Sequence, residues 1–131
     1  FKLVNDEHGH AVGDRALRAF ADMIRDTLRT TDIAGRYGGE EFAFVFPETT
    51  PQEAAVLAER LRQRFENLVI TLDNGPPLRL TTSLGVADAS AISVEDALRF
   101  ADHALYEAKA GGRNAVVMSA AIGSIGSIGQ R

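Results

Sequence analysis

The chain has 131 residues, of which 45% are hydrophobic and 24% charged, a composition that predicts one globular domain with an apolar core and excludes disordered and collagen-like proteins. A net charge of −4 predicts no general attraction to nucleic acid or anionic lipid, so an anionic ligand would depend on a few well-placed cations. The chain has no cysteine and no apolar run near the roughly 18 residues of a membrane span, which excludes disulfides and thiolate metal sites and favours a cytoplasmic setting.

The first predicted elements are a helix and a hairpin. Apolar residues recur at helical spacing over residues 13–30. Residues 33–37 and 42–46 have the apolar pattern of strands, and Gly38 and Gly39 between them supply the positive φ that a tight hairpin turn requires. This part of the chain therefore predicts one helix followed by two antiparallel strands.

A second helix and a second pair of strands follow. Thr50 has the residue type of an N-cap, Pro51 is favoured at the first helical position, and apolar residues then recur at helical spacing as far as Leu68. Residues 69–72 and 78–87 are predicted to be strands, because they flank a turn that contains Asp, Asn, Gly and two prolines.

The last predicted elements are a third helix and a short strand. Ser93 is the expected cap of the helix, Gly111 and Gly112 end it, and residues 113–118 form the strand. This order predicts an α+β fold with helices packed on a mainly antiparallel sheet. A further strand before Phe1 would complete a βαββαβ core, and because the chain does not begin with Met, we expect it to belong to a longer one.

The domain is predicted to cover residues 1–118. The remaining segment, 119–131, repeats Ile-Gly-Ser and has neither helical nor strand periodicity. It is therefore expected to be a flexible tail, a linker or a cloning remnant, without a chemical role.

The hairpin turn carries two adjacent acids, Glu40 and Glu41, beside Gly38 and Gly39. Glycines let a backbone approach a phosphate closely, and carboxylates are the hard oxygen ligands that Mg²⁺ prefers, so this pattern favours a metal–nucleotide site. Two alternatives stay open: both acids are solvated turn residues, or they are the acid–base pair of a hydrolase. The hydrolase is less favoured, since neighbouring strand residues point to opposite faces.

A second polar cluster precedes the first predicted helix. Asn5 offers both a donor and an acceptor, and Asp14 can accept two donors, which is the pattern needed to recognise the edge of guanine. The alternative is structural, with Asp14 as a helix cap and with Asn5 and Asp6 in a turn.

Two cations, Lys109 and Arg113, flank the predicted end of the third helix. Cations at this position stabilise the helix dipole, and they are also suited to hold phosphates. The sequence leaves both roles open.

Four motifs, in one order along the chain, resemble those of the GGDEF domain, the catalytic domain of bacterial diguanylate cyclases. They are FKLVNDEHGHAVGD at 1–14, RYGGEEF at 36–42, TTSLGVA at 81–87 and ADHALYEAKAGGRNAV at 101–116. The signature here is GGEEF, a variant in which Glu40 replaces the Asp of the family. The resemblance implies a ferredoxin-like palm core similar to that of nucleotidyl cyclases.

The resemblance implies a nucleotidyltransferase that condenses two GTP molecules into cyclic di-GMP and releases two pyrophosphates. It implies Mg²⁺, or Mn²⁺, as the cofactor, and Glu40 and Glu41 as the metal-binding and catalytic residues, with Glu41 helping to bind metal or to activate the 3′-hydroxyl. The residues that it assigns to GTP are Asn5 and Asp14 for guanine, Gly39 for the phosphate-facing backbone, and Lys109 and Arg113 for the terminal phosphates.

Each domain would hold one GTP, so the resemblance implies that the active form is a homodimer, and that an upstream sensory or receiver domain controls it. Such a protein acts in bacterial second-messenger signalling without a nucleic-acid partner. The domain is expected in the cytoplasm, with any membrane attachment supplied by an upstream region.

A separate regulatory motif, Arg29-Thr30-Thr31-Asp32, has the RxxD pattern of the family's inhibitory product site, and Arg60 matches a position that often assists. Arg29 can pair with a phosphate or stack on guanine, and Asp32 can accept a hydrogen bond from guanine. The alternative is an ordinary surface ion pair at helical spacing.

The strand expected before Phe1 carries, in the family, an aspartate that is a principal metal ligand. We therefore expect the 131-residue chain to be inactive or weakly active by itself. Two functions are weighed: a diguanylate cyclase domain, and a catalytically silent GGDEF domain that binds cyclic di-GMP through Arg29 and Asp32, or GTP through the former active site. Retention of the complete set of candidate guanine, phosphate and acidic residues favours the enzyme.

Overall fold

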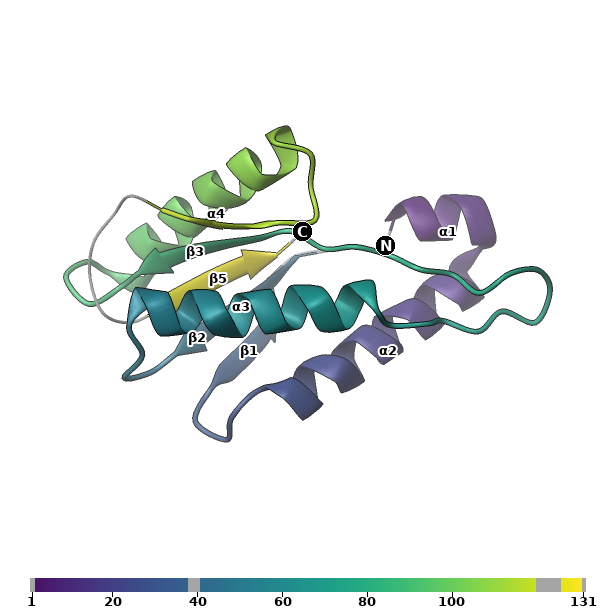
Figure 1. The fold of residues 1–131 in the computed structure, drawn as a ribbon, viewed down its shortest axis with the longest axis horizontal. Coiled ribbons are helices and arrows are strands. Elements are labelled where there is room, and N and C mark those ends of the chain that lie inside the picture. Colours follow the sequence, from purple (N-terminus) through teal and green to yellow (C-terminus); the bar gives the residue numbers. More distant parts are fainter. Residues whose placement is uncertain (1, 38–40, 120–125, 131) are drawn as a thin grey trace.

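The computed structural model describes residues 2–37, 41–119 and 126–130. In this part of the chain the elements are, in order, α1 (Lys2–His8), α2 (His10–Thr27), β1 (Ile33–Arg36), β2 (Phe42–Phe46), α3 (Pro51–Glu66), β3 (Leu84–Asp88), α4 (Val94–Ala110), β4 (Val116–Met118) and β5 (Gly126–Gln130). Helices cover both faces of one sheet, with α3 and α2 in front of it and α4 behind it in the view of Figure 1. The fold is α+β with a mainly antiparallel sheet, as predicted.

The N-terminal region differs from the predicted single helix over 13–30. Gly9 adopts a φ of 89° and separates two helices, α1 and α2, and no side chain caps the start of α2. Asn5 therefore lies in a helix rather than in a turn, and Asp14 lies inside α2 rather than at its cap. The positive φ that glycine permits explains the break, because it interrupts a polar stretch that would otherwise continue as one helix.

The front face of the sheet holds the main core. Phe42, Phe44 and Phe46 of β2 are buried on this face, while the residues between them are half-buried. Phe20 of α2 packs edge-on against Phe42, with ring centroids 5.0 Å apart, and against Phe65 of α3 at 4.6 Å. The apolar stripes predicted for both helices therefore meet over β2.

Strand β3 is buried along its whole length, because helices cover both of its faces. Gly85 makes the approach of α4 possible: a Cβ at this position would lie 1.9 Å from the backbone oxygen of Ala101. Alanines line the facing side of α4, and they are Ala97, Ala101, Ala104 and Ala108. The small side chains explain why α4 lies so close to the strand.

The predicted strands 69–72 and 78–87 are mostly wrong. This region forms a single bridge between Ile70 and Leu78, and regular pairing begins only at Leu84. The turn between them contains two prolines, which cannot donate to a ladder. The segment instead packs on the N-terminal helices, where Ile70 is buried with Val4 and Ala16.

The strand order is β1-β2-β5-β3-β4, and only the β3–β4 pair is parallel. The sequence analysis expected residues 119–131 to be a flexible tail and a strand before Phe1 to complete the sheet. In the structure, Gly126–Gln130 occupies the position between β2 and β3 and pairs antiparallel with both. The strand is favoured in this position because, without it, the facing edges of β2 and β3 would have unpaired backbone donors and acceptors in the middle of the sheet.

Among the described residues, no helix combines the length and the apolar character that a membrane span requires.

Candidate functional site

The register of the sheet brings distant parts of the chain to one end. Phe42, at the start of β2, pairs with Gln130, which pairs with Leu84 at the start of β3, which in turn pairs with Val116 at the start of β4. The hairpin before β2 and the loop before β4 therefore lie at the same end of the sheet, about three strand spacings of 4.8 Å apart. Figure 1 shows the α4–β4 loop at this end.

The N-terminal helices extend from the same end. A segment that includes Ile70 and Leu80 packs against these helices, and the chain then continues to the start of β3 at Leu84. Arg15 of α2 fixes this arrangement by donating to the backbone oxygen of Thr71 at 2.7 Å. The end of the sheet is thus bordered by α1 and α2, by the hairpin and by the α4–β4 loop.

The hairpin contributes Glu41. Its backbone oxygen accepts a hydrogen bond from the Tyr37 amide at 2.7 Å, which closes the hairpin. The residue is half-buried and lines a cavity of about 510 Å³ between the hairpin and α4, which Tyr37 and Tyr106 also line. Gly39 and Glu40, the other two residues predicted here, lie outside the described residues.

The side chain of Asn5 in α1 packs against Gly13 of α2. A Cβ added at Gly13 would lie 1.5 Å from the Asn5 Oδ1, so only glycine leaves room for this amide. The Asn5 Oδ1 is buried and, within the described part of the chain, has no hydrogen-bond partner. Asp14, the next residue of α2, is exposed. A buried acceptor without a donor is costly, so a ligand that supplies an N–H would be stabilised here.

The loop after α4 has a defined backbone. Gly112 has a φ of 117°, and the amides of Gly112 and Arg113 donate to the backbone oxygens of Lys109 and Ala108, which is the hydrogen-bond pattern of a Schellman motif. The helix therefore ends at the predicted glycines. Lys109 is half-buried in the last turn of α4, and Arg113 is exposed on the loop.

A side-chain network that the sequence analysis missed ties this loop to α3. Arg62 donates from Nη1 to the Asn114 Oδ1 at 2.9 Å and from Nε to both carboxylate oxygens of Glu59 at 3.0 Å. Asn114 in turn donates to Glu66. The hydrogen bond that Arg62 donates to Glu59 raises the pKa of Arg62 and lowers the pKa of Glu59. Helical spacing could have suggested the pairs within α3, but nothing local points to a partner 52 residues away.

The predicted product site is a closed ion pair. Arg29 donates to both carboxylate oxygens of Asp32, at 2.7 to 3.1 Å, and its Nη2 donates to the hydroxyl of buried Thr49 at 2.8 Å. The hydrogen bond to Asp32 raises the pKa of Arg29. Asp32 has no exposed side-chain surface, whereas 44% of the Arg29 side chain is exposed.

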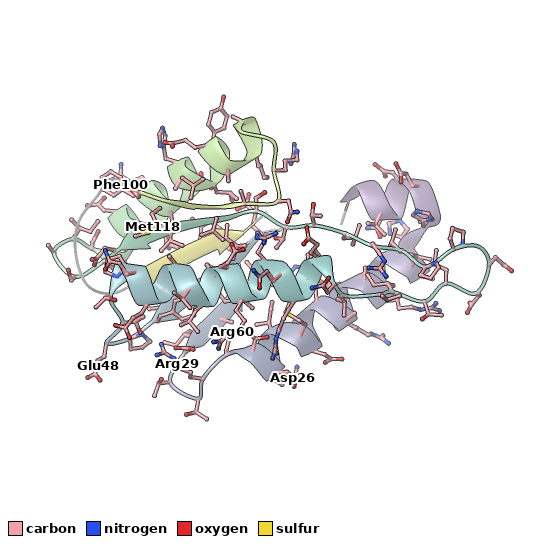
Figure 2. All side chains as sticks on the ribbon, viewed as in Figure 1. Asp26, Arg29, Glu48, Arg60, Phe100 and Met118 are labelled. Atoms are coloured by element: carbon pink, nitrogen blue, oxygen red, sulfur yellow. The ribbon has the colours of Figure 1, made fainter. Side chains whose placement is uncertain are left out.

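Arg29 and Asp32 line a second cavity of about 510 Å³, to which Arg25 and Arg36 also contribute. The structure does not bring Arg60 into this cavity. Figure 2 shows Arg29 extending from the turn between α2 and β1 and Arg60 extending from α3. Arg60 lines a separate hollow on α3 together with Glu59 and Gln63, and its assignment to the product site stays a prediction.

In the described ranges, no three His, Cys, Asp or Glu side chains are grouped closely enough to form a metal site. Glu41 is the described member of the predicted acidic pair, and its carboxylate is a ligand type that suits Mg²⁺. The assignment of Glu40 and Glu41 to metal stays a prediction.

Comparisons with known proteins point to one family. The family model described as "Diguanylate cyclase, GGDEF domain" matches residues 1–115. The response regulator PleD of Caulobacter vibrioides is 41% identical over 124 residues, which are 92% of this chain but only 27% of PleD. The chain thus spans less than a third of this relative.

Two solved structures are similar in fold. The GGDEF domain of DgcB from Caulobacter crescentus, in complex with c-di-GMP, matches with a TM-score of 0.83 and 35% identity, over 90% of this chain and 71% of that one. The active GGEEF domain of a diguanylate cyclase from Vibrio cholerae matches with a TM-score of 0.76 and 34% identity, over 91% of this chain and 76% of that one.

Proposed function

Because the chain belongs to the diguanylate cyclase GGDEF family, we propose that it is a catalytic domain that condenses two GTP molecules into cyclic di-GMP and two pyrophosphates. The observation that carries this proposal is the register of the sheet, which puts Glu41 of the hairpin and the loop with Arg113 at one end. A carboxylate such as Glu41 can bind the metal ion of a metal–triphosphate complex, and a cation such as Arg113 at the same end of the sheet can bind its phosphates. The solved GGEEF domain from Vibrio cholerae, described as active, supports the same reading of this variant signature.

Guanine would bind between α1 and α2. The buried Asn5 Oδ1 has no donor among the described residues, and the ring N–H and amino group of guanine would supply one. Asp14, exposed one residue beyond Gly13, would accept a second donor from the same edge of the base. An adenine base presents a different pattern of donors and would leave this pair unsatisfied.

The phosphates would extend from there toward the α4–β4 loop. Arg113 and Lys109 would hold the terminal phosphates, and the backbone of Gly39 would approach them from the hairpin. Mg²⁺, or Mn²⁺, held by Glu40 and Glu41 would neutralise the negative charge that develops on the phosphate oxygens during the transfer.

The reaction needs two domains, because each would hold one GTP. The 3′-oxygen of one GTP forms a bond to the α-phosphorus of the other, and the bond from that phosphorus to the departing pyrophosphate breaks. The proton of the 3′-hydroxyl passes to a base, a role that we assign to Glu41. The twofold arrangement of a homodimer repeats the step in the opposite direction and closes the ring.

Turnover with Mg²⁺ tests the proposal. The chain, extended upstream to include the strand expected before Phe1 and fused to a dimerising coiled coil, would be incubated with GTP, and cyclic di-GMP would be detected by mass spectrometry. We expect product, and we expect it to fall about a hundredfold or more in Glu41→Ala. A folded dimer that makes no product but binds cyclic di-GMP would instead identify a receptor module.

Product inhibition is proposed at Arg29 and Asp32, since cyclic di-GMP is bound in the solved structure of the DgcB domain. The ligand would have to open the ion pair, so that Arg29 meets a phosphate and Asp32 meets guanine. We predict that Arg29→Ala raises the inhibitory concentration of cyclic di-GMP about tenfold or more while initial turnover is retained. Unchanged inhibition in Arg29→Ala would contradict the assignment of the product site. Arg25 lines the same cavity, so Arg25→Ala serves as the comparison.

A further inference from the structure

The loop that carries Arg113 is held at both of its ends. On the α4 side, the amide of Arg113 donates to the Ala108 oxygen at 2.9 Å. On the sheet side, the oxygen of Ala115 accepts from the Leu84 amide at 3.0 Å. Between these two anchors, Asn114 is bound through its side chain to α3.

The backbone of this loop has a conformation that side chains rarely adopt. Three consecutive residues have positive φ: 117° at Gly112, 65° at Arg113 and 49° at Asn114. Glycine takes this conformation without strain, but at Arg113 and Asn114 it has a cost that the surrounding structure must offset. Asparagine tolerates the left-handed region better than most residues.

The side chain of Asn114 supplies an offsetting interaction. Its Oδ1 accepts from Arg62 at 2.9 Å and its Nδ2 donates to Glu66, so both ends of the amide are used. Arg62 is itself fixed, because Glu59 binds its Nε through both carboxylate oxygens and Glu66 lies 3.6 Å from its Nη1. Only 15% of the Arg62 side chain is exposed. The anchor is therefore a rigid feature of α3.

We propose that Asn114, held by Arg62 and Glu66, is a positioning residue that aims Arg113 at the terminal phosphates of GTP. This inference rests on the proposed function, which gives Arg113 its phosphate. Arg62 is paired with two carboxylates and is mostly buried. Arg113 is exposed, so of these two arginines it is the one that can reach a ligand. Fixing the Cα next to Arg113 limits the conformations that the guanidinium samples, which lowers the entropy cost of binding.

Asn114→Gly is the sharpest test, because glycine keeps the positive φ and removes only the tether. Binding of GTP with Mg²⁺ to the 131-residue chain would be measured by titration calorimetry. We expect binding about tenfold weaker than in the parent chain. The affinity for cyclic di-GMP should be unchanged, since Arg29 and Asp32 lie on other elements. Asn74→Gly, in the exposed turn before β3, is the matched control and should bind GTP like the parent chain.

A double-variant cycle separates positioning from a general structural role. In an Arg113→Ala background, Asn114→Gly should cause no further loss of GTP binding. Equal losses in the two backgrounds would overturn the inference, as would full binding by Asn114→Gly when Arg113→Ala weakens it. An Arg113→Ala variant with unchanged GTP affinity would instead show that the proposed phosphate role of Arg113 is wrong, and the inference would fall with it.

Arg62→Met supplies a second route if Asn114→Gly does not fold. Methionine keeps an unbranched apolar stem and removes the donors, so Asn114 loses the same partner. We expect a smaller loss of GTP affinity than in Asn114→Gly, because the hydrogen bond from Asn114 to Glu66 remains, and thermal unfolding of each variant would establish that the fold is retained. A folded Arg62→Met with the affinity of the parent chain contradicts the inference.

Discussion

At the scale of single residues, the contact between Asn5 and Gly13 places the Asn5 amide where it could bind a ligand. The Asn5 amide lies against Gly13, on the opposite helix of a tight pair, and the break at Gly9 brings the two helices face to face. The Oδ1 is buried and meets no donor in the part of the chain that the structure describes, so a ligand N–H would satisfy it. Gly13 is thus required because a larger residue would collide with the Asn5 amide. Its backbone is helical and does not itself require glycine.

The residue-scale prediction concerns that space. In Gly13→Ala the new Cβ would lie 1.5 Å from the Asn5 Oδ1, so the amide must rotate away. We expect GTP binding, measured by titration calorimetry, to weaken about tenfold. Asn5→Ala is the control, because it removes the acceptor without adding bulk. In an Asn5→Ala background, Gly13→Ala should change little, and a large further loss would mean that Gly13 acts through the helix pair instead.

At the scale of elements, α4 and β3 depend on each other. Helix α4 packs directly on the backbone of β3, because Gly85 faces Ala101 and the neighbouring turn of the helix. The same helix ends in the Schellman motif that starts the loop of Arg113. A displacement of α4 would therefore move the proposed phosphate-binding loop as well as open the core.

The element-scale prediction is that Gly85→Ala destabilises the domain strongly. The added Cβ would lie 1.9 Å from the Ala101 oxygen and 2.5 Å from the Leu105 amide nitrogen, and backbone atoms cannot rotate away as a flexible side chain can. We expect the free energy of unfolding in urea to fall by about 3 kcal/mol. Gly35→Ala, where a Cβ meets nothing within 4 Å, is the matched control. Equal unfolding midpoints for the two variants would argue against the close packing of α4.

At the scale of the whole molecule, hydrogen bonds from arginine side chains link elements that are distant in sequence. Arg62 joins α3 to the α4–β4 loop, and Arg15 joins α2 to the segment before β3. Two carboxylates on α3 have lowered pKa values: hydrogen bonds from Arg62 lower that of Glu59, and hydrogen bonds from Thr50 lower that of Glu53. Both effects make folding more favourable when the acids are ionised.

The whole-molecule prediction is a loss of stability in acid. A carboxylate whose pKa is lower in the folded state stabilises fully above its unfolded pKa, about 4.3 for glutamate, and loses that contribution as the pH falls through the folded value. We expect the Tm to be steady near neutral pH and to fall below about pH 4.3. Glu59→Gln should have a lower Tm at pH 7 and a shallower fall in acid. A profile parallel to that of the parent chain would show that the Glu59–Arg62 pair does not contribute.

Local chemistry made several elements predictable. The capping box of Thr50 and Glu53 starts α3 as expected, Ser93 caps α4 by accepting from the Asp96 amide, and the glycines end it. These signals act over three or four residues, so one sequence contains them completely. Strand β2 matches the strand predicted over residues 42–46 for the same reason, because its apolar pattern is also local.

The sequence by itself determined the fold class, the family motifs and the residue types at the candidate site, since these depend on short-range periodicity and on spacing along the chain. Only the tertiary structure decided which of them meet. The strand between β2 and β3, the tether of Asn114 to Arg62 and the separation of Arg60 from the Arg29 cavity depend on contacts between residues far apart in sequence. Such contacts are fixed by the packing of whole elements, which no local pattern encodes.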